Sequence, residues 1–207
     1  MTTARGNVAL TSVWLIRHGE PDPDSRGCCY GRLDVGLAPT GRQQVQAVAG
    51  MLAAEPLSVI YASPRRRTRE SADILAQGRS CAIQFDGRLR EIDFGDFEGH
   101  TYDEIAQSHP ELYRQWMTRP TETQFPNGES FRQMRARVLC ATREIFARHR
   151  GQSIAIVSHG GVNRILLADV LAVPDDRIFR MAQDFAAVNL VRWIGDYAVV
   201  EMMNARA

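Results

Sequence analysis

The chain has 207 residues, 44% of them hydrophobic, and its 25 basic and 24 acidic residues give a formal net charge of +1. This length suits a single domain with a sizeable core. A charge so close to zero gives no field over the whole molecule that would attract nucleic acid or an anionic membrane, so neither partner is expected. Any positive charge that matters for function has to be local.

The N-terminal segment and the hydropathy of the chain bear on its location. Residues 1–12 contain one arginine and no sustained apolar core, which is not the layout of a secretory signal. No apolar run approaches the ~18 residues of a transmembrane helix. We therefore expect a cytoplasmic protein with a flexible segment at residues 1–12 and a single domain over residues 13–207.

The cysteines indicate free thiols rather than a disulfide framework. The sequence contains Cys28, Cys29, Cys81 and Cys140, with no C-x-x-C pair. Adjacent cysteines are poorly placed for a mutual disulfide, so free thiols in a reducing compartment are expected. The sequence leaves open whether the chain is a monomer or a homodimer.

Six segments have the apolar, β-branched composition of strands. In chain order they are residues 13–16, 57–62, 82–85, 153–157, 188–193 and 198–202. The last two are joined through Gly195 and Asp196, a combination typical of a hairpin turn. We therefore expect the chain to end in an antiparallel hairpin.

Helix starts are marked by capping signals between these strands. Capping boxes begin at Thr40, Thr101 and Ser130, and Ser63 precedes a proline that suits the first helical turn. Apolar residues then recur at helical spacing. They are Val45, Val48, Ala49 and Leu52 in one helix and Phe131, Met134, Val138, Ala141 and Ile145 in another, and we expect them to lie in the core.

Strands that alternate with helices predict an α/β fold. We expect a mostly parallel sheet with helices on both faces and the C-terminal antiparallel hairpin at one edge. Residues 100–128 break this order into short helical pieces punctuated by Pro110, Pro120 and Pro126. We interpret this segment as a helical lid insertion over the carboxyl edge of the sheet.

Polar residues directly follow two of the predicted strands. The first strand ends in Arg-His-Gly-Glu at residues 17–20, and the fourth ends in Ser-His-Gly-Gly at residues 158–161. Open α/β sheets bind ligands at the carboxyl ends of parallel strands. His18 and His159 are therefore expected to lie close together in one ligand site.

Two further features indicate that the ligand of this site is an anion. Residues 65–67 are three arginines at the start of a helix, where backbone N–H groups also favour anions. The glycine-broken loop at residues 89–99 carries four carboxylates: Glu91, Asp93, Asp96 and Glu98. Each feature alone has an ordinary structural explanation, but together they indicate acid–base chemistry beside bound phosphate.

In combination these motifs resemble the histidine phosphatase superfamily, which has the phosphoglycerate-mutase-like fold. The resemblance covers residues 13–202 and depends on the motif at residues 17–20, Ser63-x-x-x-Arg67, Glu91 ahead of Phe94-Gly95, and the motif at residues 158–160. It implies that His18 is the nucleophile and becomes phosphorylated. It also implies that Arg17, Arg67 and His159 complete a phosphate clamp and that Glu91 is the proton donor.

The implied chemistry is physically consistent. Phosphoryl transfer spreads charge over three equatorial oxygens, so it depends on positioning and fixed positive charge. His18 must be neutral to attack, whereas we expect His159 to be more useful when the phosphate dianion holds it charged. Asp93, Asp96 and Glu98 are alternatives to Glu91 that rank lower by their position in the motif.

No metal or other cofactor is implied. The sequence has no H-E-x-x-H pattern, and the clustered arginines would repel a cation. The expected partner is therefore a small phosphomonoester alone.

The loop after the first motif bears on the substrate. Cofactor-dependent mutases of this superfamily carry an asparagine where this chain has Asp24, whose carboxylate would repel phosphate unless it points away. Residues 27–37 and 125–131 look most like the α-ribazole-5′-phosphate phosphatases. Asp24 is a candidate substrate-binding residue because it stands at the position of that asparagine.

Four more residues are expected to contact substrate. Tyr30 and Gly31 match positions that line the phosphate pocket in the wider superfamily, and we expect Arg32 to add charge at its mouth. Gly160, which belongs to the motif at residues 158–160, is expected to contact substrate as well. For the loop that carries the first three, a purely structural role is an equal alternative.

The expected reaction is hydrolysis of a phosphomonoester, with α-ribazole 5′-phosphate as the first candidate substrate. The alternatives are a broad-specificity phosphatase for sugar or glycerate phosphates and a phosphoglycerate mutase. A phosphate-binding module without catalysis is a further alternative. The presence of His18, Glu91 and His159 together argues against that last possibility.

Overall fold

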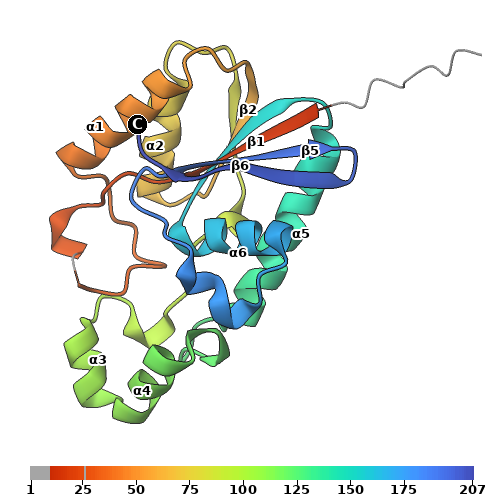
Figure 1. Cartoon of the computed structure of the whole chain (residues 1–207). Coiled ribbons are helices and arrows are strands. Elements are labelled where there is room, and N and C mark those ends of the chain that lie inside the picture. The colour runs from red at the N-terminus through yellow and green to blue at the C-terminus, as the bar shows by residue number, and fades with distance from the viewer. Residues whose placement is uncertain (1–9, 26) are drawn as a thin grey trace, which may run out of the picture.

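The computed structural model describes residues 10–25 and 27–207 (Figure 1). A six-stranded sheet in the order β3-β2-β4-β1-β5-β6 forms its centre. The strands are β1 (Leu10–Arg17), β2 (Leu57–Ala62), β3 (Ala82–Phe85), β4 (Ser153–Ser158), β5 (Val188–Ile194) and β6 (Tyr197–Ala205). β1, β2, β3 and β4 pair in parallel, whereas β5 runs antiparallel to both β1 and β6. The expected sheet and its C-terminal hairpin are confirmed.

The first strand begins earlier than expected. β1 starts at Leu10 because Leu10, Thr11 and Ser12 pair with β5. The prediction of a flexible segment is therefore wrong for residues 10–12. Residues 1–9 lie outside the described residues.

Helices cover both faces of the sheet, as expected. α1 (Pro39–Met51) and α2 (Arg66–Ala76) lie on one face, and α5 (Phe131–Arg148) and α6 (Gly160–Leu171) lie on the other (Figure 1). Alternate residues of β1 serve the two sides: Val13 and Leu15 pack with α5 and α6, whereas Trp14 and Ile16 pack with α1 and α2. β1 is thus buried on both faces, as its continuous apolar run predicts.

Two of the four predicted helix caps are confirmed. Thr101 and Ser130 each form a complete capping box. Thr40 does not cap α1, which begins at Pro39 because a proline at the first position already suits the helix. The Thr40 hydroxyl instead donates to the carboxylate of Glu20.

Ser63 is not a helix cap either. α2 begins at Arg66, and its N-cap residue is Arg65, which makes no side-chain cap hydrogen bond. The Ser63 hydroxyl lies 2.9 Å from Nε2 of His159 instead. A hydroxyl placed by its sequence context at a helix start is therefore used for a contact between distant segments.

The segment expected to be a lid, residues 100–128, consists of short helical pieces. These are α3 (Tyr102–Ser108), α4 (Pro110–Thr118) and a 3₁₀ turn at Pro120–Glu122. They pack on a separate small core that includes Phe97, Trp116 and Phe125. We call residues 100–128 the roof segment, because Tyr102, Trp116 and Pro120 line a cavity at the carboxyl edge of the sheet.

The helices of the described chain are not suited to span a membrane. Over residues 10–25 and 27–207, none combines the length and the apolar composition that crossing a bilayer requires.

Candidate active site

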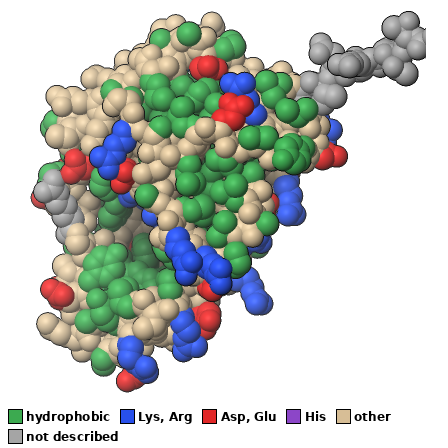
Figure 2. All heavy atoms as spheres, viewed as in Figure 1, with side chains coloured by type: hydrophobic (Ala, Val, Ile, Leu, Met, Phe, Trp, Pro, Cys, Tyr) green, Lys and Arg blue, Asp and Glu red, His purple; other side chains and the backbone are tan. Residues whose placement is uncertain are grey.

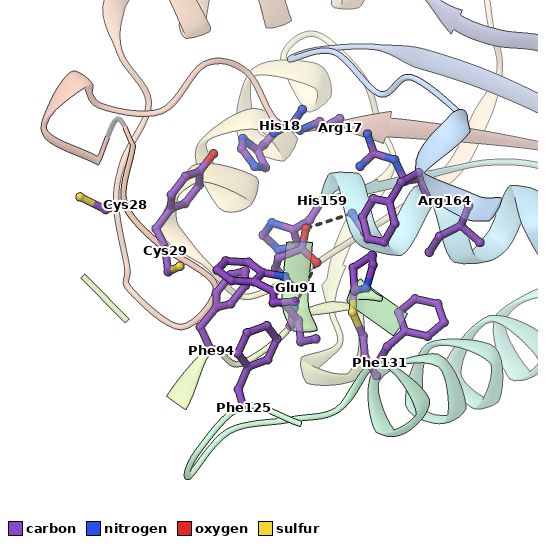
Figure 3. Close-up of a pocket in the computed structure, with 18 of the residues that line it drawn as sticks. Arg17, His18, Cys28, Cys29, Glu91, Phe94, Phe125, Phe131, His159 and Arg164 are labelled. Carbon is purple, nitrogen blue, oxygen red and sulfur yellow. Dashed lines mark hydrogen bonds between the residues drawn. The ribbon is translucent and has the colours of Figure 1, made fainter. Parts of the chain in front are cut away.

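A cavity of about 250 Å³ lies between the sheet edge and the roof segment. Figure 2 shows the surface hollowed there, with hydrophobic side chains on the side of the roof. The charged and imidazole side chains among its described lining residues are Arg17, His18, Arg67, Glu91, His159 and Arg164. The structure therefore gathers all five predicted catalytic residues around one cavity. Figure 3 shows Arg17, His18, Glu91 and His159 there.

His18 is buried and held by its neighbours. Its Nδ1 lies 2.8 Å from the carbonyl oxygen of Gly19, and a carbonyl only accepts, so Nδ1 carries the proton. In the neutral ring the lone pair is then on Nε2. Burial and the positive charges of Arg67 and Arg17 hold the pKa of His18 well below its usual value of 6.5. His18 is thus a neutral imidazole at neutral pH, with the lone pair of the ring on Nε2.

Arg17 is fixed from two sides. Its guanidinium donates to the carbonyl of Gln183 and lies 4.1 Å above the centre of the Phe185 ring. Gln183 is itself held by side-chain hydrogen bonds with Asn163 and Asn189. Nε of Arg17 is buried and has no hydrogen-bond partner among the described residues. The guanidinium of this cavity-lining residue therefore has an unused donor at Nε.

Arg67 ties the first turn of α2 to the loop that follows β1. Its guanidinium is fully buried and donates to the carbonyls of Leu33 and Gly31, at 2.9 and 3.2 Å. It also lies 5.1 Å from the centre of the Tyr30 ring. Burial lowers the pKa of Arg67 to about 10, although Glu91 acts in the opposite direction. The side chain remains cationic at neutral pH.

His159 lies beside His18, with 5.3 Å between the ring centres. It is fully buried, and burial together with the charge of Arg67 lowers its pKa well below 6.5. The charged form expected from the sequence is therefore not favoured by the protein itself. Only an added negative charge, such as that of a bound anion, would favour the protonated ring.

Glu91 is oriented by backbone groups. One carboxylate oxygen accepts from the N–H of Gly161 in the first turn of α6, at 3.0 Å, and the other accepts from the N–H of Ile92. A β-carbon on Gly161 would lie 2.3 Å from Oε1 of Glu91, so the glycine makes room for this carboxylate. Figure 3 shows Glu91 at the cavity together with His159.

The three alternative carboxylates serve the loop instead. Asp93 accepts from the N–H of Gly95, Asp96 accepts from the side chain of Asn127, and Glu98 accepts from several backbone N–H groups. None of them is among the described residues that line the cavity. This geometry favours Glu91 as the proton donor.

The predicted substrate residues are placed unequally. Tyr30 lines the cavity, and Gly31 contributes its carbonyl to Arg67. A β-carbon on Gly31 would meet the carbonyl oxygen of Ile92 at 1.7 Å, so only glycine fits there. Gly160 leaves space for the guanidinium of Arg164, whose Nη1 would lie 3.0 Å from an added β-carbon.

Arg32 and Asp24 lie apart from the cavity. Both are exposed and neither is among its described lining residues. The Arg32 guanidinium lies 4.0 Å from the carboxylate of Asp93. The Asp24 carboxylate therefore points away from the base of the cavity. The sequence had left this orientation open.

Arg164 is a cavity residue that the sequence analysis missed. Its Nε donates to the carbonyl of Met181 at 2.9 Å, and burial with the charge of Arg17 lowers its pKa. It follows Gly160 by four positions, and a helix places such residues on the same face. The periodicity of α6 was thus the signal that could have revealed it.

The apolar wall of the cavity was largely missed as well. Its members are Ile92, Phe94, Tyr102, Trp116, Pro120, Phe125, Phe131, Met134, Ile178 and Phe179. They come from the loop at residues 89–99, the roof segment, α5 and residues 178–179, and no local pattern links these four stretches. The cavity therefore combines a cationic base with an apolar, mainly aromatic wall.

The cysteines and possible metal ligands were the remaining candidates for chemistry in the described structure. Over the described residues the four cysteines form no disulfide, as expected, and burial raises the pKa of Cys29 to about 12. Across residues 10–25 and 27–207, no group of three or more His, Cys, Asp or Glu side chains is placed to hold a metal ion.

Comparisons with known proteins agree with this geometry. The family model of the histidine phosphatase superfamily (branch 1) matches residues 13–206. Phosphoserine phosphatase 1 of Hydrogenobacter thermophilus is 30% identical over 182 residues, which cover 88% of this chain and 86% of that protein.

Two solved structures share the fold over nearly their whole length. Bacillus stearothermophilus YhfR superposes with a TM-score of 0.90 at 32% identity, covering 95% of this chain and 98% of its own. The α-ribazole phosphatase from Shigella flexneri gives a TM-score of 0.86 at 27% identity, covering 95% and 97%. This chain therefore belongs to branch 1 of the histidine phosphatase superfamily and is a phosphatase.

Proposed function

We propose that this phosphatase hydrolyses phosphomonoesters through a phosphohistidine on His18, without a metal ion. The observation that carries the proposal is the state of His18. Its Nδ1–H is held by the Gly19 carbonyl, and its pKa is lowered, so Nε2 offers a lone pair beside the guanidiniums of Arg17 and Arg67.

The reaction has two balanced steps. Nε2 of His18 attacks phosphorus, the P–O ester bond breaks, and the leaving oxygen takes a proton from the carboxyl group of Glu91. Water then attacks the phosphohistidine and gives its proton to Glu91. The N–P bond breaks, its electron pair returns to Nε2, and inorganic phosphate leaves. Arg17 and Arg67 offset the charge on the phosphoryl oxygens throughout.

The apolar wall supports a substrate with a flat, apolar leaving group. Phe94, Trp116 and Phe125 contact one another in the wall, with ring centres 5.0 to 5.6 Å apart. Such rings favour stacking on another aromatic group. α-Ribazole 5′-phosphate carries an aromatic base, so we propose it as the first substrate, in line with the name of the Shigella relative.

A small anionic phosphomonoester is the second candidate. The observation that favours it is Arg164, a further guanidinium at the cavity. Among the described residues, its Nε has a hydrogen-bond partner and its two terminal nitrogens have none. A carboxylate close to the phosphate would pair with it. Phosphoserine has such a group, and the relative from Hydrogenobacter thermophilus is named for that substrate.

A panel of substrates tests both parts of the proposal. We expect kcat/KM to be higher for α-ribazole 5′-phosphate than for phosphoserine and 3-phosphoglycerate, and a chelator should leave turnover unchanged. His18→Ala should abolish hydrolysis of every substrate, p-nitrophenyl phosphate included. Full activity of this variant would disprove the phosphohistidine, whereas a preference for phosphoserine would change only the substrate.

A further inference from the structure

Ser63 is a buried serine that the proposed reaction does not use. It follows β2, is fully inaccessible to solvent, and its backbone is held at both ends. Its N–H donates to the carbonyl of Val157, and its own carbonyl accepts from the hydroxyl of Thr68. The Ser63 hydroxyl is thus presented rigidly to Nε2 of His159, at 2.9 Å.

The direction of this hydrogen bond follows from the partners of Ser63. Within the described part of the chain, Oγ has two of them: the backbone N–H of Arg65, at 3.5 Å, and Nε2 of His159. Arg65 can only donate. If Nε2 also donated, the hydroxyl proton would be buried without an acceptor, which is costly. The Ser63 hydroxyl therefore donates to Nε2, and the proton of the neutral imidazole is on Nδ1.

Nδ1 of His159 is buried and has no hydrogen-bond partner in the described residues. A buried polar atom without a partner calls for an explanation, and in a ligand cavity the ligand supplies one. His159 lines the cavity, and Nε2 is occupied by Ser63. Nδ1–H is thus the ring donor that remains for a bound phosphoryl group.

The surrounding charges oppose a cationic His159. Arg67 from α2, Arg17 and His18 from the end of β1, and Arg137 from α5 all act to keep its ring neutral. The carboxylate of Glu91 accepts hydrogen bonds from the backbone N–H groups of Ile92 and of Gly161 in α6. A donor that stays neutral avoids adding another buried positive charge.

We propose that Ser63 is a positioning residue that fixes His159 as a neutral imidazole, so that its Nδ1–H donates to a phosphoryl oxygen. This inference rests on the proposed function of the same site. It gives the two histidines matching tautomers with opposite uses. His18 offers the lone pair of Nε2, and His159 offers the proton of Nδ1, so neither ring has to be charged before the reaction.

The tautomer can be observed directly in the intact protein. Long-range ¹H–¹⁵N correlation spectra of ¹⁵N-labelled enzyme distinguish protonated from unprotonated ring nitrogens, and a His159→Gln variant assigns the signals. Near neutral pH, we expect Nδ1 of His159 to be protonated and Nε2 unprotonated, both in free enzyme and with orthovanadate bound. An Nε2–H tautomer, or two protonated nitrogens in the vanadate complex, would overturn the inference.

Substitution of Ser63 supplies the functional arm. Loss of one hydrogen bond to the ring should lower kcat/KM of Ser63→Ala about tenfold and give mixed tautomers. Ser63→Thr keeps a hydroxyl and should retain the Nδ1–H tautomer. Thr142→Val removes a buried hydroxyl of α5 that bonds only helix carbonyls, and it should change neither readout.

The outcomes separate this inference from the proposed function. If Ser63→Ala keeps the wild-type kcat/KM and tautomer, the role of Ser63 is refuted even when His18→Ala is inactive. If His18→Ala remains active, the phosphohistidine fails whatever the tautomer of His159. If Ser63→Ala does not fold, the spectra of the wild-type enzyme still decide the question.

Discussion

The protonation state of His18 is set by its surroundings rather than by the ordinary pKa of imidazole. Burial is the largest cause, and Arg67 and Arg17 add to it, so the pKa is held well below 6.5. The hydrogen bond to Gly19 acts in the opposite direction and is outweighed. The ring therefore stays neutral, with the lone pair on Nε2, to lower pH than a free imidazole does.

This state predicts the acid limb of the pH–rate profile. In the proposed reaction neutral His18 is the reactive form, so kcat/KM for p-nitrophenyl phosphate should persist as the pH falls through 6.5 and decline only well below that value. The rates have to be expressed per concentration of substrate dianion, since the phosphate itself titrates near about pH 6. A limb at the ordinary imidazole pKa after that correction would contradict the buried nucleophile.

Gly161 provides a second prediction, about Glu91. In Gly161→Ala the new β-carbon would lie 2.3 Å from Oε1 of Glu91, so the carboxylate must move and lose its hydrogen bond. We expect kcat to fall about 100-fold, because general acid catalysis depends on that position. The melting temperature should change little, since a flexible side chain gives way. Unchanged kcat would reassign proton transfer to Asp93, Asp96 or Glu98.

At the scale of elements, the start of α1 holds the segment that carries His18. Gly19 and Glu20 lie directly against Gly41, and a β-carbon on Gly41 would meet the carbonyl oxygen of Glu20 at 2.1 Å. Gly50 near the other end of the same helix has open space around it. One helix thus contains a glycine that the packing requires and one that it does not.

These two glycines make a matched pair of variants. Gly41→Ala forces backbone against backbone, and we expect it to reduce the free energy of unfolding by about 1–3 kcal/mol. Gly50→Ala should stabilise by about 0.5–1 kcal/mol, since alanine is the better helix former. Denaturant unfolding measures both values. Equal effects of the two substitutions would show that α1 does not hold the His18 segment.

For the molecule as a whole, the buried histidines link stability to pH. Their pKa values are lowered in the folded state, so below 6.5 the unfolded chain binds more protons than the folded one. The stability that the two neutral histidines contribute is then fully present above pH 6.5, and it is lost as the pH falls below that value. Carboxylates with lowered pKa values, such as those of Asp86 and Glu129, act only at more acid pH.

Unfolding measurements between about pH 7.5 and pH 5 isolate this effect. The free energy of unfolding should fall with acidification by up to about 1.4 kcal/mol per pH unit for each buried histidine. His159→Gln should reduce that slope, and substitution of the exposed His100 by Gln serves as the comparison. A slope that His159→Gln leaves unchanged would show that His159 is not buried as a neutral ring.

The sequence by itself determined the features that depend on near neighbours. Apolar runs located the strands, capping boxes located the starts of α3 and α5, and polar residues after β1 and β4 identified the ligand edge. Each signal operates over a few residues, and the rule that parallel strands end at one edge brought His18 and His159 together. The five predicted catalytic residues consequently line one cavity.

Only the tertiary structure decided which distant groups meet. Ser63 and His159 are 96 positions apart. The local sequence therefore predicted a helix cap at Ser63, whereas in the fold its hydroxyl is a hydrogen-bond partner of the His159 imidazole. The aromatic wall and the outward placement of Asp24 likewise depend on how the roof segment and the loop after β1 pack. Long-range packing carries no local pattern, and burial among arginines, rather than residue type, lowers the pKa of both His18 and His159.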